Sequence, residues 1–418
     1  MEKILASIIT IGDELLIGQV VDTNSAWIAQ ELNKAGIWLK RRISVGDVKE
    51  EIVHALDEES KSSHIIIITG GLGPTNDDIT KQVLNEYFGG RLVVNEEVLK
   101  HIKYLFEQVF RRPIIERNLQ QAEVPDICTV LHNKRGTAPG MWIEKNGKVY
   151  VSLPGVPHEM KGLMTDEVIP RLQQVFTMPF IDHRTLLTAG IGESYLAEVI
   201  KDWEAQLPAH VKLAYLPNYG MVRLRITGMG SDRNALNATL NSEFAKLQEL
   251  VREWLVSSRD ISLPMALLEL LGSKNRSLST AESCTGGYIA HLITSIPGAS
   301  NHYKGSVVAY DNEVKKQLLR VAPETLQKVG AVSEEVVREM VQGAIAQLHT
   351  NYAVAVSGIM GPDGGTPEKP VGTVWVAAGN EEKQVTRRFH FRYDRQRNIE
   401  MTAIQALNLL RKFILENS

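Results

Sequence analysis

Two glycine-rich segments, each directly after a predicted strand, constrain the fold of this sequence more than any other feature. The first is Thr69–Asp78, which follows Ile65–Ile68, and the second is Ala281–Gly287, which follows Arg276–Thr280. Glycines let the backbone turn sharply and approach a ligand, and the amides at the start of a following helix point outward. Both segments are therefore predicted to be strand-to-helix turns that bind ligands.

The composition excludes several classes of protein. A chain of 418 residues predicts two or three domains, and a hydrophobic content of 44% with 23% charged residues is ordinary for a soluble globular protein. The net charge of −3 provides no basic field, so nucleic acid is not an expected partner. We expect no membrane span and no signal peptide, and the two distant cysteines, Cys128 and Cys284, favour the reducing cytoplasm over a disulfide framework.

Alternating strand and helix patterns predict the fold class, which is α/β. Such patterns fill residues 1–170 and 259–418, so each region is expected to form an α/β domain around a parallel sheet. Residues 171–258 are expected to form a small α+β connector with strands at 184–190 and 221–228 and loops at 207–210 and 216–220.

Polar residues gather at the predicted strand ends of the first domain. Turns at the carboxyl ends of parallel strands share one edge of the sheet, so these residues should converge. The glycines suit a phosphate or pyrophosphate, and Asp77 and Asp78 suit a hard divalent metal. The structural alternative is that either aspartate only caps the next helix and that the glycines only turn the chain.

Four groups of residues in this domain resemble the CinA family of competence/damage-inducible proteins. They are Thr69–Asp78, Asp13–Leu16 with Asp22–Asn24, Gly136–Gly140 and Leu153–Met160. The resemblance implies a molybdopterin-binding-like domain that hydrolyses ADP-ribose to AMP and ribose 5-phosphate with a divalent metal, Co²⁺ or Mg²⁺, and K⁺. The residues expected to hold the metal or act as the base are Glu14, Asp77, Asp78 and Glu159, and those expected to hold the substrate are Gly70, Gly71, Gly73, Thr137 and Gly155.

Ser283 is the candidate nucleophile of the second glycine turn. The nearby amides of Thr285, Gly286 and Gly287 suit an oxyanion, but a serine hydroxyl needs a base beside it. A lysine serves if burial keeps it neutral, and Lys315 follows the strand that ends near Tyr310. By their residues alone, Lys315 and the adjacent Lys316 are more typical of a solvated helix face.

The second half of the chain also resembles the CinA family, in its C-terminal domain. The matching segments are Ala281–Gly287, Tyr310–Lys315, Ala331–Ser333, Ser357–Gly365, Lys369–Val374 and Tyr393–Arg395. The resemblance implies an amidohydrolase acting on nicotinamide mononucleotide (NMN), with Ser283 as nucleophile, Lys315 as base and Tyr310 as assistant, and no cofactor. Arg395, Ser357 and the loop that begins at Gly361 are then expected to contact the substrate or the oxyanion, and Cys284 is the alternative nucleophile.

Together these resemblances predict a bifunctional hydrolase of pyridine-nucleotide salvage. Its partners would be small nucleotides, NMN and ADP-ribose, and the expected assembly is a homodimer. Two alternatives stay open. The N-terminal domain is a non-catalytic nucleotide-binding or pterin-binding sensor, or the chain is a competence or DNA-repair accessory protein.

Overall fold

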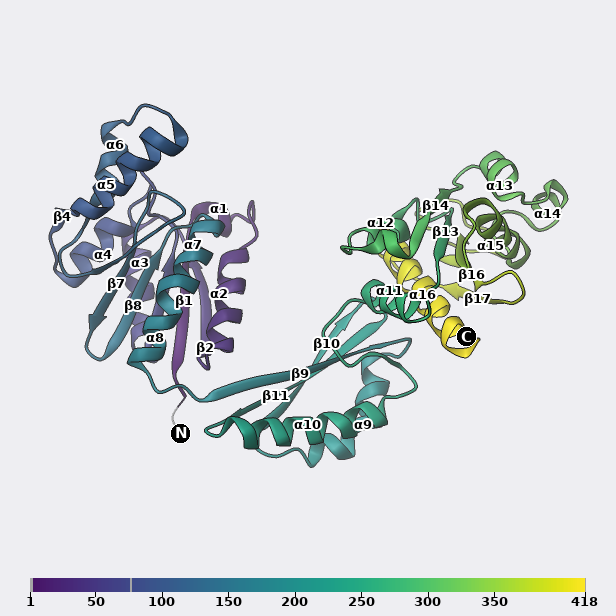
Figure 1. Ribbon diagram of the computed structural model, residues 1–418, viewed down its shortest axis with the longest axis horizontal. Helices are drawn as coiled ribbons and strands as arrows, with labels where there is room; N and C mark the ends of the chain where they lie inside the picture. Colours follow the sequence, from purple (N-terminus) through teal and green to yellow (C-terminus); the bar gives the residue numbers. More distant parts are fainter. Residues whose placement is uncertain (1–2, 76, 418) are drawn as a thin grey trace. The chain divides into compact units, whose positions relative to one another are not determined.

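The computed structural model describes residues 3–75 and 77–417, and Asn76 of the first glycine turn lies outside the described residues. The chain divides into two compact units, residues 1–182 with 229–237 and residues 183–228 with 238–418 (Figure 1). The predicted fold class, two α/β domains joined by a small α+β module, is confirmed. Within the described part of the chain, no helix combines the length and the apolar character that a membrane crossing requires.

A six-stranded sheet forms the centre of the first unit, in the order β2-β1-β3-β8-β7-β6. Its strands are β1 (Leu5–Ile11), β2 (Trp38–Val45), β3 (Ile65–Thr69), β6 (Thr129–Leu131), β7 (Gly140–Lys145) and β8 (Lys148–Leu153), and a separate two-stranded ribbon pairs β4 (Leu92–Val94) with β5 (Glu123–Pro125). The helices are α1 (Asp13–Leu16), α2 (Thr23–Lys34), α3 (Lys49–Ser60), α4 (Thr80–Phe88), α5 (Glu96–Tyr104), α6 (Glu116–Leu119), α7 (Pro157–Leu163) and α8 (Ile169–Val175).

Strand β3 shows why this sheet needs helices on both faces. All five of its residues are buried, as a continuous apolar run requires. Ile65 and Ile67 pack in one core with α2, α7 and α8, whereas Ile66 and Ile68 pack in the opposite core with α3 and α4 (Figure 1).

The expectation of a wholly parallel sheet is wrong for this domain, because β7 runs antiparallel to β8 and β6 antiparallel to β7. A two-residue turn, Asn146-Gly147, joins β7 to β8, and both residues have positive φ, 53° and 72°. Asn-Gly is the preferred sequence for this hairpin geometry, since both positions require a left-handed backbone.

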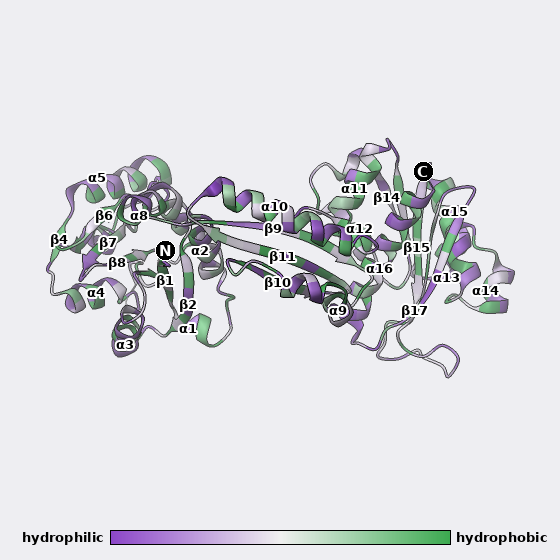
Figure 2. Cartoon of the chain, turned by 90° about the horizontal axis from the view of Figure 1, so that it is seen from below, coloured by the Kyte–Doolittle hydropathy of each residue, from purple (hydrophilic) through white to green (hydrophobic). Residues whose placement is uncertain are grey.

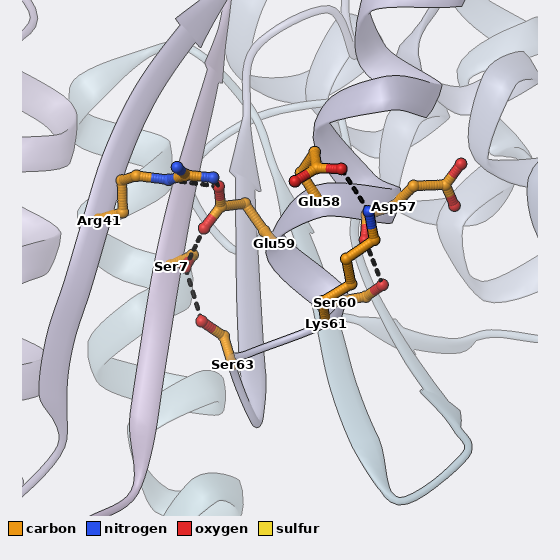
Figure 3. A network of polar contacts seen from close by, with 8 residues as sticks. All are labelled: Ser7, Arg41, Asp57, Glu58, Glu59, Ser60, Lys61 and Ser63. Atoms are coloured by element: carbon orange, nitrogen blue, oxygen red, sulfur yellow. Dashed lines mark hydrogen bonds and ion pairs between the residues drawn. The ribbon is translucent and has the colours of Figure 1, made fainter.

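A buried carboxylate ties α3 to the sheet (Figure 3). Glu59 is fully buried and accepts hydrogen bonds from Ser7 Oγ of β1 at 2.5 Å and from Arg41 Nε of β2 at 2.6 Å. Ser7 also contacts Ser63 Oγ at 2.7 Å. The neighbouring Glu58 instead forms an exposed ion pair with Lys61. The charge of Glu59 is therefore balanced by partners inside the protein. The charge of Glu58 is balanced at the surface, by Lys61 and by solvent.

The connector contains a four-stranded sheet in the order β10-β11-β9-β12. Its elements are β9 (Phe180–Ala189), α9 (Glu193–Ala205), β10 (Val211–Asn218), β11 (Met221–Gly230), α10 (Arg233–Leu250) and β12 (Leu255–Ser257). The expectation that 216–220 is only a loop is wrong, because Leu216, Pro217 and Asn218 complete β10. Strand β10 lies at the edge of the sheet, where a proline is tolerated, and a Tyr219-Gly220 turn joins it to β11.

The C-terminal domain contains a five-stranded sheet in the order β14-β13-β15-β16-β17. Its elements are α11 (Leu263–Ser273), β13 (Leu278–Glu282), α12 (Tyr288–Thr294), β14 (Tyr303–Val308), α13 (Asn312–Leu319), α14 (Pro323–Val329), α15 (Glu334–Leu348), β15 (Tyr352–Gly358), β16 (Thr373–Gly379), β17 (Gln384–His390) and α16 (Arg395–Glu416). Strands β14, β13 and β15 are parallel, but β16 and β17 are antiparallel, so the sheet is again mixed.

Two cores sandwich this second sheet. Helices α11, α12 and α16 cover one face, and α13 and α15 cover the other. The first six residues of the central strand β15 are buried, and its sequence alternates alanine and valine in the middle. The edge strand β17 is only partly covered. Because β14, β13 and β15 are parallel neighbours, their carboxyl ends lie side by side at one edge of the sheet.

Removing the charge of Glu59 should loosen the first sheet. We expect Glu59→Gln to lower the local free energy of unfolding by about 2 kcal/mol, since charge-assisted bonds to buried partners are lost. Hydrogen exchange of the β1 amides in the full chain, followed by mass spectrometry, should then be about 30-fold faster. The matched control, Glu58→Gln, should leave this exchange unchanged. Equal exchange in both variants would contradict the structural role of Glu59.

Candidate active sites

The register of the C-terminal sheet brings three chain segments to one edge. Glu282 pairs with Val308 of β14 and with Val356 of β15. The next residues continue this pairing, since Ala309 N donates to Glu282 O at 2.8 Å and Ser283 N donates to Val356 O at 3.1 Å. Ser283 and Ala309, just beyond β13 and β14, therefore lie at the same edge as Ser357 near the end of β15.

Glu282, which the sequence prediction missed, organises the turn after β13. The residue is fully buried, and its carboxylate accepts hydrogen bonds from Thr285 Oγ1 at 2.8 Å, Gly287 N at 3.1 Å, Ile289 N at 2.9 Å, Ala290 N at 2.8 Å and Ser306 Oγ at 3.2 Å. A buried carboxylate needs such partners. A charged residue at the end of a predicted strand, just before a helix without its own capping side chain, was the available signal.

This network commits several of the groups that were expected to face a substrate. The Thr285 hydroxyl and the Gly287 amide donate to Glu282, and the Gly286 amide donates to Ser283 O at 3.1 Å. The Thr285 amide has no hydrogen-bond partner in the described part of the chain. Among the donors predicted for an oxyanion, that amide is the one the turn leaves available. Gly286 and Gly287 have φ of 59° and 98°, which the turn requires.

Lys315 is a buried amine rather than a solvated one. Its side chain is 1% exposed, and Nζ donates to the carbonyls of Ala309 at 2.8 Å and Tyr310 at 3.2 Å. Burial lowers the pKa of Lys315, and the charge of Asp311 opposes this shift only in part. A neutral amine has two N–H groups and one lone pair. Because the two carbonyls use both N–H groups, the lone pair is left to accept a proton.

Cys284 is electrostatically coupled to the same amine but is itself poorly suited to attack. Burial raises the pKa of Cys284 to about 12, with the charges of Lys315 and Arg395 acting in the opposite direction. The thiol is therefore protonated at neutral pH, and the thiolate is the nucleophilic form. Ser283 beside it is 8% exposed, and no hydrogen bond engages its hydroxyl within the described residues.

Arg395, the first residue of α16, connects the remaining predicted residues. Its Nη1 donates to Gly361 O at 2.7 Å, and its Nη2 donates to the Tyr310 hydroxyl at 3.0 Å. Tyr310 is 62% exposed, so its ring lies at the surface of the site. Ser357 is buried, and its hydroxyl donates to Ala331 O at 2.7 Å. Ser357 thus ties the end of β15 to the loop before α15, and its hydroxyl is already engaged.

A cavity of about 420 Å³ gathers the predicted residues of the N-terminal domain. Those that line it are Glu14, Gly70, Gly71, Gly73, Asp77, Asp78, Thr137, Gly155 and Glu159. The glycine turn is tightly packed: a Cβ on Gly70 would lie 2.2 Å from Ile11 O, and one on Gly71 would lie 2.1 Å from Thr80 Oγ1. Larger residues would therefore displace the turn.

The four predicted metal carboxylates differ in availability. Asp78 is engaged within the turn, where it accepts from the amides of Gly73 and Thr75, both at 2.8 Å. Glu159 accepts from Asn133 Nδ2 at 2.6 Å, and burial raises the pKa of Glu159. Asp77 and Glu14 line the cavity with Asp47, a carboxylate that the prediction missed although it follows the end of β2.

Asp47 indicates that the cavity suits a cation. Burial raises the pKa of Asp47, and the charges of Asp13, Glu14 and Asp77 raise it further. A divalent ion would relieve this repulsion, and carboxylate oxygens are the ligands of hard cations. The donor chemistry therefore fits. In residues 3–75 and 77–417, however, no three His, Cys, Asp or Glu side chains lie close enough together to hold a metal ion in this structure.

Three family models match separate parts of the chain. Family models match at residues 7–174 ("Probable molybdopterin binding domain"), 183–256 ("Damage-inducible protein CinA KH domain") and 260–414 ("CinA C-terminal domain"). A "CinA-like protein" of Cytophaga hutchinsonii is 48% identical over 413 residues, covering 99% of both chains. A "Putative competence-damage inducible protein" of Caldicellulosiruptor bescii is 40% identical over 413 residues, covering 99% of this chain and 100% of that one. The crystal structure of a competence/damage inducible protein from Agrobacterium tumefaciens shares 36% identity over 36% of this chain and 92% of that one, with a TM-score of 0.35.

The KH match does not bring the usual nucleotide clamp of that fold. KH domains hold nucleic acid with a Gly-x-x-Gly loop. Residues 183–256 contain five glycines, at 190, 192, 220, 228 and 230, and no two are separated by two residues.

Proposed function

This chain belongs to the CinA family, and we propose that its C-terminal domain hydrolyses the carboxamide of NMN to nicotinate mononucleotide and ammonia. The observation that carries the proposal is the buried amine of Lys315, whose two carbonyl partners leave a lone pair at the sheet edge where Ser283 lies. The likeness of the motifs to the CinA deamidase supplies the substrate.

The residues support acyl transfer in two steps. Ser283 Oγ attacks the carboxamide carbon while Lys315 accepts the hydroxyl proton, and the Thr285 amide is an available donor for the resulting oxyanion. Collapse breaks the carbon–nitrogen bond, and Lys315 returns the proton to the departing ammonia. Water then attacks the acyl-serine with Lys315 again as base, which releases the nicotinate carboxyl group and restores Ser283.

Arg395 is the candidate contact for the phosphate of NMN. Its guanidinium is exposed and uses only part of its five donors on Gly361 and Tyr310. Guanidinium groups bind phosphate well in this geometry. We propose that the phosphate sits against Arg395 and that Tyr310 lines the entrance.

The acidic cavity supports a second activity, the hydrolysis of a pyrophosphate bond. ADP-ribose is the substrate that the resemblance implies. Glu14, Asp47, Asp77 and Glu159 would hold a divalent metal, which would offset phosphate charge and activate water when bound. The glycine turn would bring backbone amides to the pyrophosphate. The requirement for K⁺ and the homodimeric assembly remain proposals from the resemblance.

Replacing the serine and the neighbouring cysteine should separate the two candidate nucleophiles. Ser283→Ala should reduce ammonia release from NMN by at least about 1,000-fold, since the covalent route is lost. Cys284→Ala should retain most of the activity, because that thiol is buried and protonated. Ammonia release is measured with purified full-length protein. Loss of activity in the cysteine variant alone would contradict the assignment.

The pH profile should report the neutral amine. Only the unprotonated form of Lys315 accepts a proton, so kcat/KM should fall as the pH drops through the native pKa of Lys315. Burial lowers that pKa from its ordinary value of 10.5, so the acidic limb should lie below pH 10.5. Between the two pKa values the unfolded chain binds more protons, and stability should therefore rise with pH there.

A lysine-to-arginine change provides the control for this profile. Lys315→Arg places at this position a positive charge that does not lose its proton, so activity should be absent across the whole pH range. Substantial activity in this variant, or an acidic limb at or above pH 10.5 in the wild type, would exclude Lys315 as the base.

The N-terminal activity should depend on both the metal and Asp47. With ADP-ribose and Mg²⁺ or Co²⁺, the full chain should form AMP, and chelation should abolish the reaction. Asp47→Asn should weaken the apparent metal affinity at least about tenfold, whereas Glu58→Gln should have no effect. AMP is measured chromatographically. No AMP with either metal, with or without K⁺, would favour the non-catalytic sensor.

A further inference from the structure

A further cavity, of about 420 Å³, lies within the second unit, where strands of the connector meet helix α16 (Figure 2). Residues of β9 and β11 belong to the same hydrophobic core as residues of α16, so this contact is part of the fold. Gly190, Gly192 and Gly220 form the connector side of the cavity. On α16 its lining begins at Gln405, about 15 Å along the helix from Arg395. The cavity is therefore separate from the candidate amidase site.

Two positive side chains of this cavity have no partner within the protein. Arg387 of β17 and Lys412 of α16 line it, and neither forms a hydrogen bond or an ion pair with any residue in the ranges 3–75 and 77–417. Glu416 brings a negative charge, so positive charges outnumber negative ones in the lining. Gly192, which also lines the cavity, precedes the 13-residue helix α9, and no side chain caps that helix. The positive end of the helix dipole adds to a potential that favours an anion.

The amide of Asn408 points an unpaired donor into the same space. Its side chain is 5% exposed, and its Oδ1 accepts from Arg411 Nε at 3.3 Å and from Nη2 at 3.2 Å, which fixes the orientation of the amide. Its Nδ2 has no hydrogen-bond partner in the described part of the chain, and it lies 3.3 Å from the position of a Cβ built on Gly190. Both residues line the cavity. Because polar groups in such buried side chains normally have partners, an acceptor atom of a ligand is the partner that the cavity allows.

The remaining wall of the cavity is apolar and partly aromatic. Val385 and Phe389 of β17 face the cavity together with Arg387, because alternate side chains of a strand share one face. Phe413 of α16 and Ile191 of the connector also line it. Small-molecule sites have this form, an apolar wall with a few converging polar groups, and the volume lies in their usual range. The chemistry of the lining matches a planar ring that carries an anionic group.

We propose that this cavity binds a small aromatic anion, a ring that bears a carboxylate or a phosphate group. The anionic group accepts a hydrogen bond from Asn408 Nδ2, and Arg387 and Lys412 balance its charge. The ring packs against Phe389 and Phe413. The site goes beyond both proposed hydrolase activities and depends on neither of them. Its ligand joins the connector to the helix that carries the proposed phosphate contact of the amidase.

A titration of the full chain followed by saturation-transfer NMR tests the proposal with three probes that share one ring. They are benzoate, phenyl phosphate and the uncharged benzamide. We expect at least one of the two anions to bind about tenfold or more tightly than benzamide, because hydrogen bonds to charged groups are stronger than neutral ones. The tighter anion identifies the group as carboxylate or phosphate. Equal affinity for all three probes, or no binding of either anion at millimolar concentration, would overturn the proposal.

Two variants and a matched control locate the binding. Asn408→Asp keeps the oxygen that Arg411 binds, so the variant should fold, but it replaces the donor by a carboxylate oxygen and should weaken anion binding at least about tenfold. Lys412→Met should weaken it by a similar factor. Arg388→Gln removes an exposed arginine on the opposite face of β17 and should change nothing. Anion affinity that survives Asn408→Asp, or that falls equally in Arg388→Gln, would refute this site.

Discussion

The buried carboxylate of Glu282 is the interaction on which the C-terminal site depends. It stands at the end of β13, where the parallel register with β14 and β15 holds three chain segments together. By accepting from the Thr285 hydroxyl and three amides of the following turn, it fixes the path of the chain directly after Ser283. The same bonds engage donors that could otherwise bind a substrate. Most donors of the turn therefore maintain its shape, and the Thr285 amide is left for the substrate.

Burial gives the neighbouring residues opposite chemical characters. For Lys315 it lowers the pKa and favours the neutral base, whereas for Cys284 it raises the pKa and favours the inert thiol. Desolvation disfavours the charged form of both groups. The active form of a lysine base is the neutral amine, whereas the active form of a cysteine nucleophile is the charged thiolate. One environment therefore supports the lysine and disfavours the cysteine. In the N-terminal cavity, mutual repulsion among Asp47, Asp13, Glu14 and Asp77 makes a cation the natural complement.

Much of this architecture follows from the sequence, and the parts that do not have physical reasons. The run Ile65–Ile68 predicts a strand buried on both faces, and the Ser333 cap predicts the start of α15. The antiparallel β7 was missed although Asn146-Gly147 is a strong hairpin signal, and β10 was missed because Pro217 suggested a loop. Asp47 was missed because its neighbours, such as Asp13, are distant in the chain. Glu282 was missed although most of its partners follow within eight residues, because the sequence does not show that its carboxylate turns back onto their amides.

The central claim is that residue 283 carries the acyl group during amide hydrolysis. Its most direct test is mass spectrometry of the full-length protein, acid-quenched during turnover of NMN and then digested. The account predicts a peptide heavier by the nicotinoyl mononucleotide group, with fragmentation assigning the added mass to Ser283. The same mass on Cys284 would contradict it. So would the absence of any adduct on the protein when a burst of ammonia equal to the enzyme concentration shows that an intermediate accumulates.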